Sequence, residues 1–284
     1  MTMAMVQSHM AFLEPWAGRE ESPYVRGLAT EEYPRQNFTN LDYTVQIQDA
    51  RQEMSSFKLD THGFEFHRDD GIDEELVGAI RRKDKPLITE KYYPVVESII
   101  KSKTGAQRVI IFDHTYRRRN PSLDPSVNKD GNEQPASVAH VDQSELGAIG
   151  RVERHAGDDA ERLLRGRVQV LNVWRPINGT VEDWPLAVMD YRSVQHTDIH
   201  PTNIFKERHE RMGQTVSINY NRDQKWFYLP NQSTNEVTII KIWDSKEDAA
   251  KLCPHGAFPH PDADTEAKPR ESLEVRCLVF YEEE

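Results

Sequence analysis

The segment Val168–Trp174 reads VQVLNVW, and it is short and rich in β-branched and aromatic residues, as is typical of a β-strand. Segments of the same kind follow, each bounded by Pro, Asn or Gly, at Leu186–Tyr191, Thr215–Tyr220, Lys225–Leu229, Glu236–Trp243 and Leu273–Tyr281. The second half of the chain is therefore predicted to consist of short β-strands.

The first half has a different pattern. Apolar residues at helical spacing predict helices over 74–82, 91–103 and 144–166, and residues 107–113 predict a buried strand. Residues 117–137 are polar and contain Pro, Asn and Gly, so we expect a long surface loop with Arg117–Arg119 in solvent. Helices beside a β-rich half predict a mainly β protein with flanking helices, a double-sheet barrel.

The domain organisation is expected to be simple. Residues 1–60 have weak periodicity, apart from an alternating stretch at Tyr43–Ile47, and we expect an N-terminal arm that packs on the core. Residues 61–284 contain no visible boundary and are expected to form a single domain.

Composition excludes several classes of function. The 47 acidic residues outnumber the 36 basic ones, and the net charge of −11 disfavours nonspecific nucleic-acid binding. No apolar run is long enough to span a bilayer, so we expect no membrane insertion. Two cysteines, Cys253 and Cys277, are too few for a disulfide framework or a zinc ribbon, which makes the cytoplasm the simplest location.

A His-x-Asp pair at His140 and Asp142 directly follows the predicted loop. In an extended segment these two side chains project to the same side and can bind one metal ion. The same pattern also occurs at 67/69, 196/198 and 260/262, and a single occurrence is usually a solvated pair. Only the pair at 140/142 is followed by several predicted strands and then by a histidine among small and apolar residues, His255. Two histidines and one carboxylate form the facial set that suits iron(II) oxygenases, because three coordination positions stay open.

Downstream of His255, Arg270 and Ser272 open the last predicted strand. An arginine here can hold the distal carboxylate of 2-oxoglutarate, and a serine two residues later faces the same way and adds a hydroxyl donor. Arg276 lies on the same strand face and is the alternative anchor, unless it pairs with Glu274. Asn172 and Trp174 share a strand face near the predicted metal site, where each either contacts the co-substrate or substrate or has a structural role.

The chain resembles the fungal AsaB-like hydroxylase/desaturase family, whose relatives include gibberellin desaturase and a cephalosporin methoxylase component. The resemblance extends over about residues 60–284, and the matching stretches are HVDQS at 140–144, NVWRP at 172–176, PLA at 185–187, WFY at 226–228, NEV at 235–237, IKIWD at 240–244, HGAF at 255–258 and RESLEVR at 270–276. It implies a double-stranded β-helix of the jelly-roll, cupin-like type and dependence on Fe(II), 2-oxoglutarate and O2. Gly256 departs from the family pattern, which has a small hydroxyl residue there, and we expect this to change packing and not metal ligation.

These observations together predict an oxidoreductase. The expected reaction is hydroxylation or desaturation of an aliphatic C–H in a small secondary metabolite, with release of succinate and CO2. The alternatives are an iron oxygenase that does not use 2-oxoglutarate and a non-catalytic barrel subunit of a biosynthetic complex. As partners we expect a small-molecule substrate and, as an open option, a second copy of the chain. The sequence does not identify the substrate.

Overall fold

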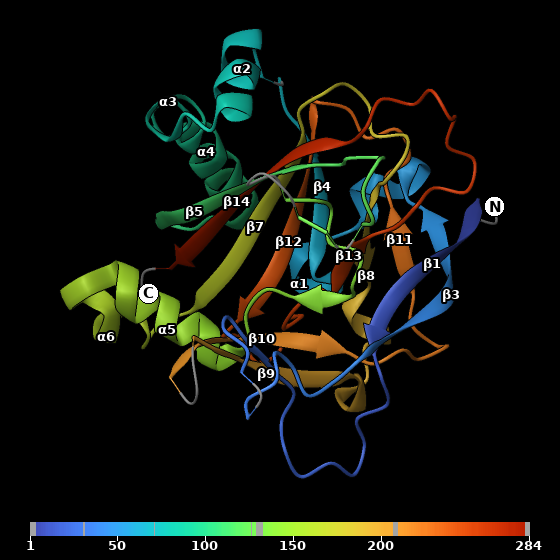
Figure 1. The fold of residues 1–284 in the computed structure, drawn as a ribbon. Helices are drawn as coiled ribbons and strands as arrows, with labels where there is room; N and C mark the ends of the chain where they lie inside the picture. Colours follow the sequence, from blue (N-terminus) through green and yellow to red (C-terminus); the bar gives the residue numbers. More distant parts are fainter. Residues whose placement is uncertain are drawn as a thin grey trace.

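Two β-sheets face each other in the computed structural model, which describes residues 4–30, 32–70, 72–125, 127–128, 133–206 and 210–281 (Figure 1). In spatial order, the nine-stranded sheet contains β1 (Met5–Leu13), β3 (Asn40–Asp49), β11 (Trp226–Tyr228), β8 (Leu186–Met189), β13 (His255–Ala257), β6 (His140–Val141), β10 (Arg211–Ile218), β9 (Ile199–Phe205) and β2 (Tyr24–Arg26). The five-stranded sheet contains β4 (Phe64–Arg68), β12 (Glu236–Asp244), β7 (Val168–Pro176), β14 (Glu271–Phe280) and β5 (Arg108–Arg118).

The strand β7 lies at the centre of the smaller sheet and is buried at every position. Val170 and Trp174 belong to the core between the two sheets, whereas Leu171 and Val173 belong to a second core under the helices. Successive side chains of a strand point to opposite faces, so a strand covered on both faces needs apolar residues at both. This double burial explains why apolar residues occur on both faces of the strand.

Helices cover the outer face of the smaller sheet. They are α2 (Glu74–Arg82), α3 (Lys85–Lys91) and α4 (Tyr93–Thr104), which Figure 1 shows together at its upper left. The short α1 (Leu59–His62) precedes β4, and α5 (Glu145–Ala156) and α6 (Ala160–Leu163) follow β6. The helix predicted over 144–166 is therefore interrupted, because Gly157 adopts a φ of +57° and ends α5.

The first residues of the chain form part of the larger sheet. Strands β1 and β3 pair antiparallel along their whole lengths, from Met5 opposite Gln48 to Leu13 opposite Asn40. Alternate positions face the core, where Met10 and Phe12 are buried. Sequence periodicity indicated only the middle of β3, because the polar Ser8 lies on the buried face of β1 and the apolar Met5 lies on its exposed face, which breaks the alternation.

Most strand pairs are antiparallel, and the two facing sheets with a shared apolar core form a jelly roll. The predicted mainly β fold with flanking helices is confirmed. The strand predicted over 107–113 continues to Arg118 as β5, at the edge of the smaller sheet. A β-bulge at Phe112 shifts its register, since Arg276 pairs with Asp113 but Cys277 pairs with Ile111.

Candidate metal centre and cofactor pocket

His140 and His255 lie side by side on neighbouring strands of the larger sheet. Strands β6 and β13 pair in register at these two residues, and the ring centroids are 4.6 Å apart. Asp142 follows His140 by two residues. One ligand atom from each of the three side chains lies within 4.8 Å of the other two. The three residues could therefore hold a single metal ion.

Hydrogen bonds to the backbone set the protonation of both imidazoles. Nδ1 of His140 lies 2.7 Å from the carbonyl oxygen of Val138, and Nδ1 of His255 lies 3.0 Å from that of Cys253. A carbonyl oxygen can only accept a hydrogen bond, so each Nδ1 carries the proton and donates it. In each neutral ring the lone pair is then on Nε2, as a metal ligand requires. The hydrogen bond from Nδ1 to the backbone also fixes the orientation of the ring.

The Asp142 carboxylate is held by two donors through a single oxygen. Its Oδ2 accepts from Nδ2 of Asn172 at 2.6 Å and from Nε of Arg276 at 3.3 Å, while Oδ1 lies 3.6 Å from Nε2 of His140. Burial favours the protonated acid, but the nearby Arg276 cation outweighs it and holds the pKa of Asp142 well below its usual value. The carboxylate is thus ionised, with Oδ1 directed at the two imidazoles.

Arg276 is surrounded by acceptors. Its guanidinium donates to Glu274 at 2.7 Å and to the Thr115 hydroxyl at 2.6 Å, and it forms a further ion pair with Asp113 at 3.3 Å. Burial acts against the cation, but Asp142 and Glu274 more than compensate and raise the pKa of Arg276. The charge of Arg276 is therefore neutralised by side chains of the protein itself.

Arg270 has a different environment. It is 4% exposed, its Nε donates to the Ser272 hydroxyl at 3.3 Å, and one terminal nitrogen donates to the backbone oxygen of Trp184 at 2.8 Å. Its guanidinium carbon lies 4.8 Å from the ring centroid of Trp174. No carboxylate of the described residues is within ion-pair distance, and burial together with Arg117 lowers the pKa of Arg270 to about 9. Burying an unpaired cation costs free energy, so a carboxylate that bound Arg270 would be favoured.

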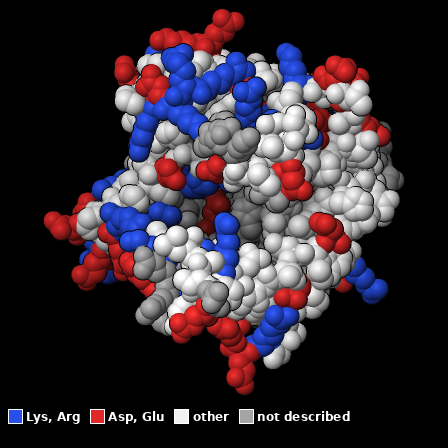
Figure 2. Space-filling model, in the orientation of Figure 1, with Lys and Arg blue, Asp and Glu red and all other residues white. Residues whose placement is uncertain are grey.

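The three clustered residues and Arg270 line one common pocket, which also contains Arg117, Ala136, Trp174, Leu186, Gly256, Ala257 and Glu274. Figure 2 shows a hollow in the middle of this face, with basic and acidic side chains gathered around it. The predicted position of Arg117 in a solvated loop is wrong. It lies on β5, and its guanidinium donates to the backbone oxygen of Gln134 at 2.8 Å.

Comparison with known proteins agrees with this chemistry. A family model described as an oxidoreductase/YMDC permease-like domain matches residues 10–280. The Fe(II)/2-oxoglutarate-dependent dioxygenase nvfI of Aspergillus novofumigatus (strain IBT 16806) is 36% identical over 274 residues, which cover 96% of both chains. The hydroxylase/desaturase efuI of Hormonema carpetanum is 30% identical over 269 residues, which cover 87% of both chains. A solved structure of the iron and alpha-ketoglutarate-dependent endoperoxidase NvfI superposes with a TM-score of 0.90, at 35% identity over 99% of both chains.

The chain belongs to the Fe(II)/2-oxoglutarate-dependent dioxygenases.

The predicted oxidoreductase class, the resemblance to fungal hydroxylase/desaturases and the use of Fe(II), 2-oxoglutarate and O2 are thereby confirmed. The described helices of this dioxygenase include none with the length and apolar character needed to cross a membrane. Membership of this family argues against the two alternatives. These were a non-catalytic barrel subunit and an iron oxygenase that does not use 2-oxoglutarate.

The structure brings together the site residues singled out from the sequence of this dioxygenase. Asn172 contacts Asp142, Trp174 lies beside Arg270, and Ser272 bonds Arg270, whereas Arg276 lies against Asp142. Sequence reasoning missed Arg117, Thr115 and Asp113 on β5. The predicted strand, with side chains alternating regularly between its two faces, did not show which face these residues occupy. The bulge at Phe112 adds one residue, so the side chains after it lie on the opposite face from the one that regular alternation gives.

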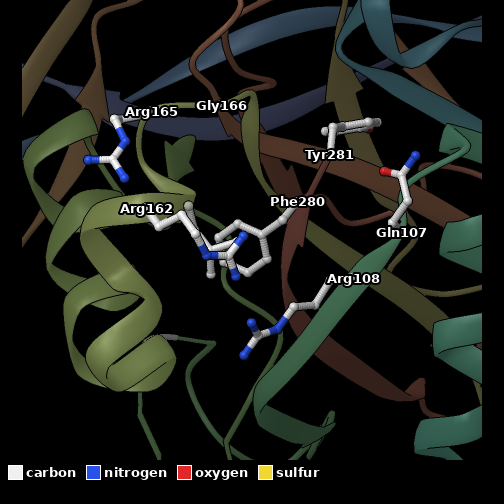
Figure 3. Close-up of a pocket in the computed structure, with 8 residues that line it drawn as sticks. Gln107, Arg108, Arg162, Arg165, Gly166, Phe280 and Tyr281 are labelled. Atoms are coloured by element: carbon white, nitrogen blue, oxygen red, sulfur yellow. The ribbon is translucent and has the colours of Figure 1, made fainter. Parts of the chain in front are cut away.

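A larger pocket lies at the other end of β5 and shares no lining residue with the metal centre. Figure 3 shows Arg108 and Arg162 reaching toward the space beside Phe280. Asp159 binds both arginines, at 2.7 Å and 3.1 Å. These two arginines already share a carboxylate partner, in contrast to Arg270.

Proposed function

We propose that His140, Asp142 and His255 are the iron ligands of this dioxygenase and that Arg270, assisted by Ser272, binds the distal carboxylate of 2-oxoglutarate. The observation that carries the proposal is the cluster itself: two imidazoles with protonated Nδ1 and an ionised carboxylate present ligand atoms within 4.8 Å of one another. This donor set leaves positions open for a bidentate co-substrate and for dioxygen.

The buried charge of Arg270 supports its role as the co-substrate anchor. An incoming carboxylate would remove the cost of a buried, unpaired cation, and the planar guanidinium can bind it through two hydrogen bonds. Trp174 packs on the guanidinium and Ser272 accepts from Nε, so both side chains orient it. Arg276 is less suited to this role because Glu274, Asp113 and Asp142 already surround it.

Arg276 and Asn172 are instead positioning residues that act through Asp142. Their hydrogen bonds to Oδ2 fix the carboxylate rotamer and leave Oδ1 for the metal. Each imidazole keeps its proton on Nδ1 throughout, because that proton is donated to the backbone. When bound, Fe(II) with 2-oxoglutarate supplies the activation of dioxygen that the side chains cannot provide.

The reaction that we propose is oxidation of an aliphatic C–H in a small secondary metabolite, by hydroxylation or desaturation, with release of succinate and CO2. The similar proteins named as hydroxylase/desaturases support this choice. The chain's own contribution is to bind, orient and exclude water around the reacting carbon.

The experiment is anaerobic addition of Fe(II) and then 2-oxoglutarate to the metal-free protein, followed by the visible charge-transfer band of the chelate. We expect the band in the wild type and in His9→Ala, a control on the exposed face of β1. His140→Ala and His255→Ala should lack both the band and bound iron. Retention of stoichiometric iron in either variant would exclude that histidine as a ligand.

A further inference from the structure

Asp142 lines a second pocket as well as the one that contains Arg270. The second pocket has a volume of about 490 Å³ and lies between α5 and the start of β10. This volume falls in the range of small-molecule sites. We call it the α5–β10 pocket.

Apolar side chains form part of its wall and are open to solvent. Leu146 on α5 is 44% exposed and Met212 on β10 is 58% exposed, and Ile149 lies with them in the lining. Apolar side chains in the lining of a pocket offer an apolar ligand a surface to cover. An apolar molecule would gain by burying them.

The remaining wall carries three arginines without acidic partners, Arg151, Arg154 and Arg211. In the described part of the chain no carboxylate lies within ion-pair distance of them, although Glu153 lines the same pocket. Other surface arginines of this protein do have such partners, as Arg165 has in Glu161. The pocket therefore combines an apolar wall with an excess of basic side chains, since its three arginines outnumber the two acids Asp142 and Glu153 in the lining.

Of the three arginines, Arg151 is best suited to bind a ligand, because its side chain is held in place and partly buried. Its guanidinium carbon lies 5.5 Å from the ring centroid of Phe112, which fixes the side chain between α5 and β5. Burial and the neighbouring Arg154 lower its pKa, although Asp113 acts in the opposite direction. A half-buried cation next to other cations is stabilised by binding an anion.

Two glycines of α5 shape the pocket. A Cβ on Gly147 would lie 2.4 Å from the backbone oxygen of Gln214, so glycine is needed where α5 touches β10. A Cβ on Gly150 would meet no atom within 4 Å, although Gly150 lines the pocket. The open space above Gly150 is therefore available to a ligand, and a larger side chain there would fill it.

We propose that the α5–β10 pocket binds the oxidisable substrate, and that this substrate is an apolar molecule with a carboxylate group. The carboxylate binds Arg151, and the apolar body covers Leu146 and Met212. Asp142 is common to the linings of this pocket and of the proposed metal site, so this assignment rests on that site. The pocket thereby selects for an anionic substrate over its neutral ester or alcohol.

The first test uses a matched pair of fluorescent probes and the full chain without metal. 8-Anilinonaphthalene-1-sulfonate is an apolar anion, and N-phenyl-1-naphthylamine is nearly the same molecule without the charge. We expect Arg151→Met to weaken binding of the anionic probe about tenfold and to leave the neutral probe unchanged, because one charge-assisted contact is lost. Gly150→Leu should weaken both probes, while Gly150→Ala and the surface variant Arg222→Met should affect neither.

Two results would overturn the proposal. Equal affinity of Arg151→Met and the wild type for the anionic probe would mean that the arginine does not bind an anion. Undiminished binding of both probes by Gly150→Leu would mean that they bind elsewhere. Circular dichroism and thermal unfolding of each variant identify any loss that comes from misfolding.

The second test connects the pocket to the iron site. Dodecanoate is added to the anaerobic protein with Fe(II) and 2-oxoglutarate, and methyl dodecanoate is the neutral control. We expect dodecanoate alone to shift the charge-transfer band in the wild type, and neither compound to shift it in Arg151→Met. If the band is present but dodecanoate leaves it unchanged, the substrate assignment fails and the metal site stands. If the wild type shows no band, the metal site fails, and the probe titrations alone decide whether the pocket binds an apolar anion.

Discussion

Nε of Arg276 donates to Oδ2 of Asp142 at 3.3 Å, although the two residues are 134 positions apart in the chain. The contact links the last strand of the smaller sheet to the segment that follows β6 in the larger sheet. Asn172 donates to the same oxygen from the neighbouring strand β7. The Asp142 carboxylate is thus oriented by the opposite sheet, and the geometry of the site depends on how the two sheets pack.

Removal of the Arg276 guanidinium should weaken iron binding more than co-substrate binding. We expect Arg276→Met to raise the Kd for Fe(II) by about 10- to 100-fold, the usual effect of losing a residue that orients a ligand. The measurement is an anaerobic Fe(II) titration, followed by a 2-oxoglutarate titration at saturating iron. If the variant instead binds iron normally and loses 2-oxoglutarate, Arg276 is the co-substrate anchor and Arg270 is not.

Removal of the Arg270 charge should have the opposite effect. Arg270→Met leaves the iron ligands and their hydrogen bonds intact, so the Fe(II) Kd should stay within about twofold of the wild type. The 2-oxoglutarate Kd should rise by about 30- to 100-fold, since a charge-assisted pair contributes about 2–3 kcal/mol. Arg222→Met, on the surface with its side chain 88% exposed, is the matched control. An unchanged 2-oxoglutarate Kd in Arg270→Met would contradict the assignment.

A buried ion cluster away from the metal centre should control stability in acid. Asp244 has no exposed side-chain surface and accepts from Lys241 at 2.6 Å and from Arg167 at 2.7 Å. Burial raises its pKa, but these two cations outweigh burial and lower it below the usual value. The folded-state pKa therefore lies below the unfolded one, so the stabilisation is complete above about pH 4 and is lost as the pH falls through the folded-state value.

Asp244→Asn tests this directly. We expect a loss of about 3–5 kcal/mol in the free energy of unfolding at pH 7, because the buried Lys241 and the partly buried Arg167 keep only the half-exposed Asp60 as a counterion. The difference from the wild type should shrink steadily as the pH is lowered below 4. Urea unfolding at a series of pH values measures it, with the exposed Asp248→Asn as the control. A difference that does not vary with pH would show that the carboxylate charge has no part in it.

Replacement of Gly256, next to His255, by a residue with a Cβ should destabilise the fold. An added Cβ would lie 3.0 Å from Cε of Met10 and 3.3 Å from the backbone oxygen of Val138. Gly256→Ala should therefore lower stability by about 1–2 kcal/mol through overpacking. Gly150→Ala, where the space is open and the backbone helical, should be neutral or stabilising by up to about 1 kcal/mol. Thermal unfolding of the two variants distinguishes them, and equal Tm values would refute the packing argument.

The sequence by itself determined the elements whose residues follow a local pattern. The strand β7 is apolar at consecutive positions because both of its faces are covered. The spacing of His140 and Asp142 and that of Arg270 and Ser272 follow from the two-residue repeat of an extended chain. These patterns act over a few residues, so they can be recognised without knowledge of the fold.

Only the tertiary structure decided which distant residues meet. The pairing of β6 with β13 brings His140 beside His255, and the bulge in β5 turns Asp113 and Thr115 toward Arg276. From the sequence Arg270 with Ser272 was the preferred anchor and Arg276 stayed an alternative, because both were predicted on one face of the same strand. They differ because Asp113 and Asp142, which belong to other parts of the chain, form ion pairs with Arg276 and not with Arg270. The positions of these two acids depend on strand register and sheet packing, which no local sequence pattern encodes.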